Sequence, residues 1–455
     1  MGVKRTTLWL VAVVTVAVLA LVATAVALGR RSGGATAVAA GPRATTSTAT
    51  THTTTTGATT AAGADALTPK IQALQEHLRT ATGDAPGWAT LGLYYVEMAR
   101  RAVDPSYYAK AEAVLKTSRE LDATDNFLAF DGEAALASGR HDFADALTWA
   151  KRGLAVNSYN AALYGALADA QTQLGQYAAA ARSVQKMVDL RPGTAAFARA
   201  SYVAELRGDL PAATSAMQAA LDAAANRSDM AFADYYLGEL ALNAGDPTTA
   251  LRHFAAGVQA DPTYAPLYEG RARANAALGH TDAAVTDFAD AVARVPQPTY
   301  VLEYADYLTS LGRTSQAQVQ YKVFLAENAL MESNGVQLDT DATLYYADHG
   351  DPAKALAIGA AGIRARPFLE MQDAYGWALH ASGRDAEALT WARKALAPGM
   401  RNALFHYHLG MILKALGRKQ SARTELTTAL RINPHFNPLQ VPLARAALTD
   451  LGASS

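Results

Sequence analysis

The stretch LGQYAAA, residues 174–180, decides the fold because it returns along the chain at a nearly constant interval. Its later versions are RGDLPAA, AGDPTTA, LGHTDAA, LGRTSQA, HGDPAKA, SGRDAEA and LGRKQSA, and each has an alanine five residues after a glycine. The glycines are Gly175, Gly208, Gly245, Gly279, Gly312, Gly350, Gly383 and Gly417, separated by 33, 37, 34, 33, 38, 33 and 34 residues. A period of this length predicts stacked structural repeats.

Each repeat reads as two amphipathic helices joined at the glycine. Leu163, Tyr164 and Leu167 have the spacing of a first helix, and the apolar residues of 177–187 have that of a second helix. Glycine ends the first helix because it adopts left-handed geometry without a Cβ clash. Proline, as at Pro192, ends the second helix because it cannot continue the hydrogen-bond ladder.

This pattern resembles the tetratricopeptide repeat (TPR) family, whose unit is a helix-turn-helix of about 34 residues. The likeness covers roughly residues 85–437. Small residues stand twelve positions after the period glycine, where the family packs one repeat on the next: Ala220, Gly257, Ala291, Gly362, Ala395 and Ala429. The resemblance implies an all-α, right-handed superhelical solenoid of about ten TPR-like repeats.

Several segments depart from the period. Gly139 precedes Ala146 by seven residues, so we expect a longer turn in that repeat. Extra residues at 222–229 and 327–341 indicate longer helices or loops, and an apolar pattern favours a longer helix for the second segment, up to Asn334-Gly335. We assign 67–437 to the solenoid, with a capping helix beginning near Thr68-Pro69, and 438–455 to a C-terminal capping helix and tail.

The N-terminal residues predict a membrane segment and a spacer. Residues 8–28 are uncharged and apolar, and 21 helical residues are long enough to cross a bilayer. We assign residues 1–31 to a single transmembrane anchor, or alternatively to a cleaved signal peptide. Residues 32–66 form a threonine- and alanine-rich linker that we expect to be disordered. Such spacers hold domains off the outer face of a membrane, so we expect the solenoid to be extracytoplasmic at the cell membrane, with a secreted or a cytoplasm-facing protein as alternatives.

Composition and motifs argue against several functional classes. The formal net charge is −1 with no long basic run, which disfavours nucleic acid as a partner. The chain has no cysteine, so thiolate chemistry and disulfides are excluded. No nucleotide-binding loop, zinc-protease motif or nucleophile elbow is found. We therefore expect a protein that is not an enzyme and needs no cofactor or metal.

Two short stretches suggest chemistry at first sight. His406 and His408 are two residues apart, so on a helix they point about 200° apart and do not share a metal. The acids of ADHGD, residues 347–351, flank the period glycine Gly350 and match the turn of another repeat. We interpret both stretches as structural.

Stacked helix pairs of this kind form a superhelix whose concave face is lined by first helices. The resemblance implies that a protein or peptide partner binds there. The residues placed on the exposed side of the first helices are Tyr202, Tyr235, Glu239, Glu269, Arg273, Asp306, Asp373, Trp377 and Tyr407. This set is aromatic and acidic, so a partner segment with basic and apolar side chains fits it best.

The leading hypothesis is a membrane-anchored scaffold or adaptor for envelope proteins. The alternatives are a substrate-presenting subunit of a separate envelope enzyme, such as a glycosyltransferase, and a stand-alone hydrolase.

Overall fold

The computed structural model describes residues 67–338 and 340–452, in which every regular element is a helix. The predicted anchor at 1–31 and the whole linker at 32–66 lie outside these residues. No helix within the described ranges is long and apolar enough to cross a membrane.

Twenty of the helices pair into ten repeats, confirming the predicted number. The five repeats of the N-terminal coil are α3(Ala85–Ala102)/α4(Ser106–Leu121), α5(Phe127–Gly139)/α6(Phe143–Val156), α7(Ala161–Gln173)/α8(Tyr177–Leu190), α9(Thr194–Leu206)/α10(Leu210–Asp222) and α11(Arg227–Asn243)/α12(Pro247–Ala260). The five of the C-terminal coil are α13(Pro266–Ala277)/α14(Thr281–Arg294), α15(Pro298–Ser310)/α16(Thr314–Ser333), α17(Thr340–Asp348)/α18(Pro352–Ala365), α19(Leu369–Ala381)/α20(Asp385–Leu396) and α21(Ala403–Ala415)/α22(Lys419–Ile432). The remaining helices, α2(Leu67–Thr80) and α23(Gln440–Asp450), pack on α3 and on α21–α22.

First helices form the interior of the solenoid and second helices its exterior. The first helix α11 buries an unbroken run from Ala231 to Leu240, whereas the second helix α12 buries only Ala250, Phe254 and Gly257. A helix buried on all sides is internal, and one with a single apolar stripe faces solvent. Neighbouring first helices also contact each other, as α3 does α5 and α17 does α19.

Glycine and aspartate build the turn inside each repeat. All eight period glycines have positive φ, from 69° to 86°. In several repeats the next residue is an aspartate whose side chain caps the second helix, as Asp246 accepts from the Thr249 amide. At Gly350, Asp351 accepts from the Lys354 amide in the same way, which confirms that ADHGD is a turn.

The expectation of a longer turn after Gly139 is wrong. His141 adopts the left-handed conformation there, with φ 64°, and Asp142 caps α6 through the Asp145 amide. His141 therefore occupies the place of the period glycine, and Ala146 follows it by the usual five residues. A search for glycine alone misplaced the turn of this repeat, because His141 keeps the backbone geometry without the residue type.

The two insertions lengthen helices. Helix α11 begins at Arg227 and has 17 residues. Helix α16 has 20 residues and ends at Ser333, followed by the C-cap Asn334 and by Gly335 with φ 79°, as the apolar pattern predicted. The capping helix α2 begins at Leu67, two residues before Pro69, the expected first helical residue.

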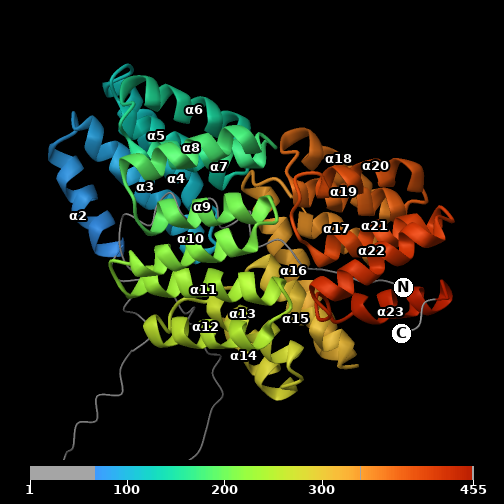
Figure 1. The fold of residues 1–455 in the computed structure, drawn as a ribbon. Coiled ribbons are helices and arrows are strands. Elements are labelled where there is room, and N and C mark those ends of the chain that lie inside the picture. Colours follow the sequence, from blue (N-terminus) through green and yellow to red (C-terminus); the bar gives the residue numbers. More distant parts are fainter. Residues whose placement is uncertain (1–66, 339, 453–455) are drawn as a thin grey trace, which may run out of the picture.

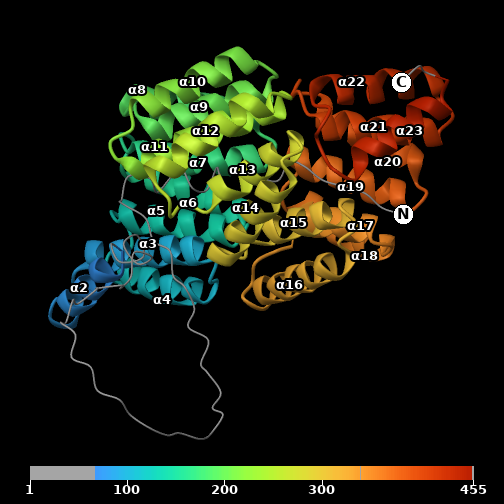
Figure 2. The ribbon, with the colours of Figure 1, turned by 90° about the horizontal axis from the view of Figure 1, so that it is seen from below.

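The helices of the N-terminal coil and those from α17 to α23 form two bodies that lie side by side, with α15 and α16 between them, as both views show (Figures 1 and 2). We call the turns within repeats the glycine edge of a coil, and the loops between repeats its loop edge. The glycine edge of the N-terminal coil meets the loop edge of the C-terminal coil with a constant offset of five repeats. The pairs in contact are His141 with Gln337, Gln173 with Arg366, Gly208 with Gly399, and Leu242 with Asn433.

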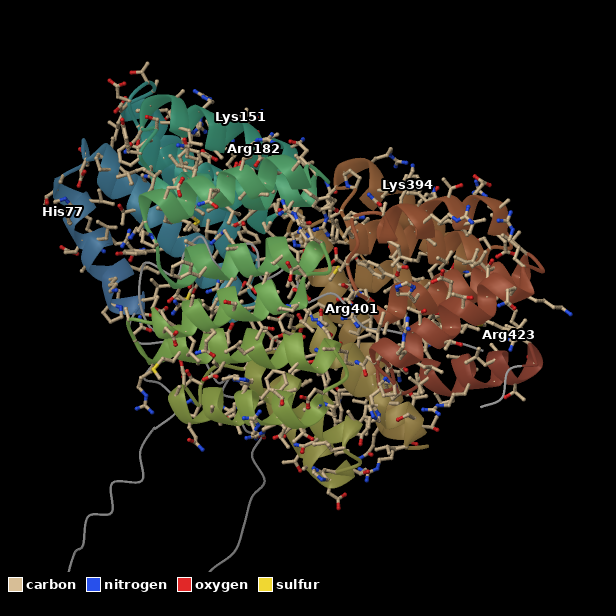
Figure 3. All side chains as sticks on the ribbon, in the orientation of Figure 1. His77, Lys151, Arg182, Lys394, Arg401 and Arg423 are labelled. Atoms are coloured by element: carbon tan, nitrogen blue, oxygen red, sulfur yellow. The ribbon has the colours of Figure 1, made fainter. Side chains whose placement is uncertain are left out.

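Apolar and polar groups both hold this junction between the coils. Tyr202 and Leu206 of α9 share a buried cluster with Leu369, Met400 and Phe405. The Asn433 side-chain amide donates to the Leu242 carbonyl at 2.9 Å. Arg401 lies where the two bodies meet (Figure 3), close to the backbone of Gly208.

Candidate binding surface on the inner wall

The nine predicted partner-binding residues all lie on first helices, namely α9, α11, α13, α15, α19 and α21. The expectation that they face an open groove is wrong. Tyr235 and Glu269 have no exposed surface, and Arg273, the most accessible, exposes 11% of its side chain. First helices crowd together inside the solenoid, so side chains on their inner side are covered by neighbouring first helices.

Arg273 is the centre of an acidic group on this wall. Its Nη1 atom lies 3.1 Å from Oε2 of Glu239 and 3.3 Å from Oε1 of Glu269. Burial, together with the nearby Glu303, raises the pKa of Glu269 well above its ordinary value. Burial also raises the pKa of Glu239, although Arg273 opposes the shift. We call Glu239, Glu269, Arg273 and Glu303 the acidic wall cluster.

Tyrosines adjoin the acidic wall cluster. Tyr235 makes edge contacts with Tyr236 and Tyr264, at ring-centroid distances of 4.8 and 6.2 Å. On α15, Asp306 accepts from the Tyr321 hydroxyl at 2.9 Å. Tyr202 belongs to the junction between the coils.

Asp373, Trp377 and Tyr407 form a second group, packed between the last two repeats. The Trp377 ring stacks on His408 with centroids 4.1 Å apart, and Asp373 lies 2.7 Å from Nδ1 of His408. His408 is fully buried. These residues therefore pack α19 against α21 in the interior of the solenoid.

The structural interpretation of the histidine pair is confirmed by their separate partners. Nδ1 of His406 lies 2.6 Å from Glu425 on α22, whereas His408 faces α19. Within the part of the chain that the structure describes, no group of three or more His, Cys, Asp or Glu side chains is placed to hold a metal ion.

Sequence reasoning missed five polar residues of the inner wall, one of which is Glu303 of the acidic wall cluster. Asp169 and Arg199 form a buried pair with contacts of 2.6 and 2.8 Å. Asp169 stands six residues before its period glycine, so the repeat register could have found it. Five of the predicted wall residues share this register position: Tyr202, Glu239, Arg273, Asp306 and Trp377. Glu205 and Glu370 lie on opposite sides of the junction between the coils and share no register position.

Glu370 is the most isolated acid of the wall. It is 2% exposed, and neither carboxyl oxygen accepts a hydrogen bond from another residue. Burial raises its pKa to about 8, and Glu205 on the opposite coil contributes. Burial likewise raises the pKa of Glu205 to about 7. The wall thus holds more carboxyl groups than cations, and part of them keep their protons near neutral pH.

Residues 403–436, which include the last helix pair, match the family model described as Tetratricopeptide repeat. The described residues form an all-helical solenoid of helix-turn-helix repeats, and its last repeat is similar to the tetratricopeptide repeat. A search of curated proteins found no match.

Solved structures resemble the chain at low identity. The APC/C hetero-tetramer Cut9-Hcn1 shares 15% identity over 84% of this chain and 81% of its own, with a TM-score of 0.41. The human IFIT1 dimer with PPP-AAAA shares 15% over 80% and 88%, with a TM-score of 0.45. A tetratricopeptide repeat protein from Parabacteroides merdae ATCC 43184 shares 17% over 57% and 98%, with a TM-score of 0.33.

Proposed function

We propose that this protein is a non-catalytic scaffold whose inner wall binds a protein or peptide segment carrying basic and apolar side chains. The observation that carries the proposal is the acidic wall cluster, where three glutamates share one arginine. A carboxyl group buried without a cation keeps its proton at a cost, and a lysine or arginine from a partner would relieve that cost. Neighbouring tyrosines supply apolar contact area with polar tips.

Access to the wall requires neighbouring first helices to move apart, because Glu269 is fully buried in the closed form. We propose that separation of the coils permits this movement. The junction is a mixed polar and apolar contact between coils of one chain, and contacts of this kind permit relative motion. Binding energy from the partner would offset the loss of junction contacts.

The proposed scaffold is tethered by residues 1–31 and lies outside the cytoplasm, with 32–66 as its spacer. The apolar run at 8–28 and the threonine-rich tract support this placement. The alternative, a substrate-presenting subunit of a separate envelope enzyme, uses the same wall and differs in requiring a catalytic partner chain.

Peptide binding tests the proposal. Fluorescence anisotropy would compare a labelled peptide of alternating lysine and leucine with a version carrying glutamate in place of lysine. We expect the basic peptide to bind more tightly, and the triple variant E239Q/E269Q/E303Q to lose most of that preference. Equal binding of both peptides, or an unchanged preference in the triple variant, would contradict the proposed wall.

A reversible lock tests the need for opening. Arg207 and Arg401 are exposed and lie close across the junction, and the chain has no other thiol to react after R207C and R401C are introduced. A cleavable bis-maleimide bridge should abolish peptide binding, and cleavage should restore it. The two single-cysteine variants treated with the same reagent are the controls, and full binding by the bridged protein would show that opening is not required.

A further inference from the structure

Each coil has one glycine edge and one loop edge, but the junction within a molecule uses only one edge of each coil. The glycine edge of the N-terminal coil is covered by the loop edge of the C-terminal coil: a Cβ at Gly208 would lie 2.3 Å from the Gly399 carbonyl oxygen, and one at Gly245 would lie 2.8 Å from that of Ile432. The loop edge of the N-terminal coil and the glycine edge of the C-terminal coil take no part in this junction. At the glycine edge of the C-terminal coil, no atom lies within 4 Å of the Cβ position at Gly279, Gly312, Gly350, Gly383 or Gly417.

The loop edge of the N-terminal coil is equally uncovered and is apolar. Leu121, Val156 and Leu190 are 46%, 37% and 36% exposed and end the second helices of three successive repeats. Tyr159, in the loop after α6, is 81% exposed. A row of large apolar residues along one edge marks an interaction surface, whereas scattered ones do not.

The repeat register shows what this row corresponds to in the covered junction. Val156 and Leu190 follow His141 and Gly175 by fifteen residues, and Ile432 follows Gly417 by the same number. Ile432 is only 5% exposed, and its carbonyl lies against Gly245 of the N-terminal coil. The backbone at this position is therefore covered by a glycine edge in the C-terminal coil, where the Ile432 side chain packs in the cluster of the last repeat and α23. In the N-terminal coil the position is left exposed.

The two free edges carry small excesses of opposite charge. The free loop edge carries exposed acids at Asp125, Asp189 and Asp222, against exposed bases at Arg191 and Arg227. The free glycine edge carries exposed bases at Lys354, Arg384, Arg418 and Lys419, against exposed acids at Asp282, Asp351 and Glu387. Opposite charges at the rim of an apolar contact favour one orientation of docking over its reverse.

We propose that the free loop edge of the N-terminal coil docks on the free glycine edge of a second copy of this chain. The contact repeats between molecules the junction that each molecule makes within itself. Helices α2 and α23 leave both edges open, because they pack beside the first and last repeats. A contact between two different surfaces leaves one edge free on each molecule, so the assembly grows head to tail, into a ring or an open chain.

Sedimentation velocity of the full chain in detergent micelles tests the association. We expect the apparent mass to rise with concentration beyond a dimer. The variant L121K/V156K/L190K should weaken the dissociation constant by about tenfold or more, because three charges would enter the apolar contact. The control V319K/L330K alters two exposed apolar residues of α16, and should associate as the wild type does.

All three chains contain the same N-terminal segment, so association through that segment would leave them indistinguishable and would overturn the proposal. The substituted side chains are exposed, and circular dichroism should show unchanged thermal unfolding. A chain that stays monomeric at all concentrations would overturn it as well.

Cysteine cross-linking tests the direction of docking. Full-length Y159C would be mixed in turn with R313C, K354C, R384C and K419C and treated with a short bis-maleimide. Head-to-tail docking predicts cross-links in at least one mixture and none between Y159C chains alone. Cross-linking of Y159C to itself without any in the mixtures would show that two loop edges meet, which contradicts the proposal.

Discussion

The glycine edges of the two coils carry the same turn in different surroundings. Gly208 and Gly383 both have φ 74°, and both end a first helix before the second begins. A Cβ at Gly208 would meet the backbone of Gly399, whereas a Cβ at Gly383 would meet nothing within 4 Å. The comparison shows that a glycine at the covered edge of the N-terminal coil meets two requirements, the left-handed backbone angle and the close approach of the other coil. A glycine at the free edge of the C-terminal coil meets only the first.

The largest expected effect comes from the apolar part of the covered junction. Met400 is 3% exposed and packs with Leu206 and Tyr202 of the opposite coil. M400A should lower the free energy of unfolding by about 2–5 kcal/mol, because it leaves a cavity in a buried cluster. The control L330A, at a residue that is 42% exposed, should change it by much less. Chemical denaturation measures both, and equal losses would mean that the junction is not packed as described.

The next effect depends on pH. The pKa of Glu370 is raised to about 8, chiefly by burial, whereas in the unfolded chain it is about 4.3. Between these values the folded state keeps a proton that the unfolded state has lost, so the stability provided by the neutral acid decreases as the pH rises toward 8. The groups facing Glu370 are Glu205, Tyr177 and Tyr202 from the N-terminal coil, with Arg366 and Asp373 from its own coil.

The variant E370Q should remove this loss, since an amide stays neutral. We expect it to match the wild type near pH 5 and to exceed it above pH 8, by an amount of the order of a few kcal/mol. E387Q, at a surface glutamate paired with Arg384, is the control and should not flatten the profile. Unfolding curves from pH 5 to 9 measure this, and parallel profiles for E370Q and wild type would contradict the assignment.

The glycine comparison itself can be tested with one matched pair. G383A should cost about 1–2 kcal/mol, the strain of a left-handed alanine. G208A should cost that amount plus about 1–3 kcal/mol for overpacking against Gly399. Denaturant midpoints measure the difference, and an equal cost at the two sites would remove the distinction between the covered and the free edge.

The smallest effect should come from the polar contact across the junction. N433A removes one of the donors to the Leu242 carbonyl, which keeps the Gly245 amide, and should cost about 1 kcal/mol because one buried hydrogen bond is lost. N334A removes a similar bond of 2.9 Å to Leu330 that is exposed and local, and should cost less. Hydrogen exchange at the ends of α11 should increase in N433A and not in N334A. An increase in N433A that is confined to other positions would contradict the assignment of this bond to the junction.

Much of the fold was predictable, but the surroundings of the candidate site were not. The period glycines, the capping aspartates and the length of α16 follow from local backbone preferences, which act over a few residues. His141 escaped prediction because left-handed geometry is favoured by glycine and tolerated by other residues. The nine wall residues were assigned to first helices correctly and to an exposed face wrongly, since burial depends on helices several repeats away.

By itself the sequence determined the helix-turn-helix repeat, its number and its turn geometry, because each depends on residues within one period. Only the tertiary structure decided that repeats five apart meet, that Glu205 and Glu370 approach across the coils, and that one edge of each coil is covered and the other free. These features arise from the small rotation between neighbouring repeats, which accumulates along the solenoid and has no signature at any single residue.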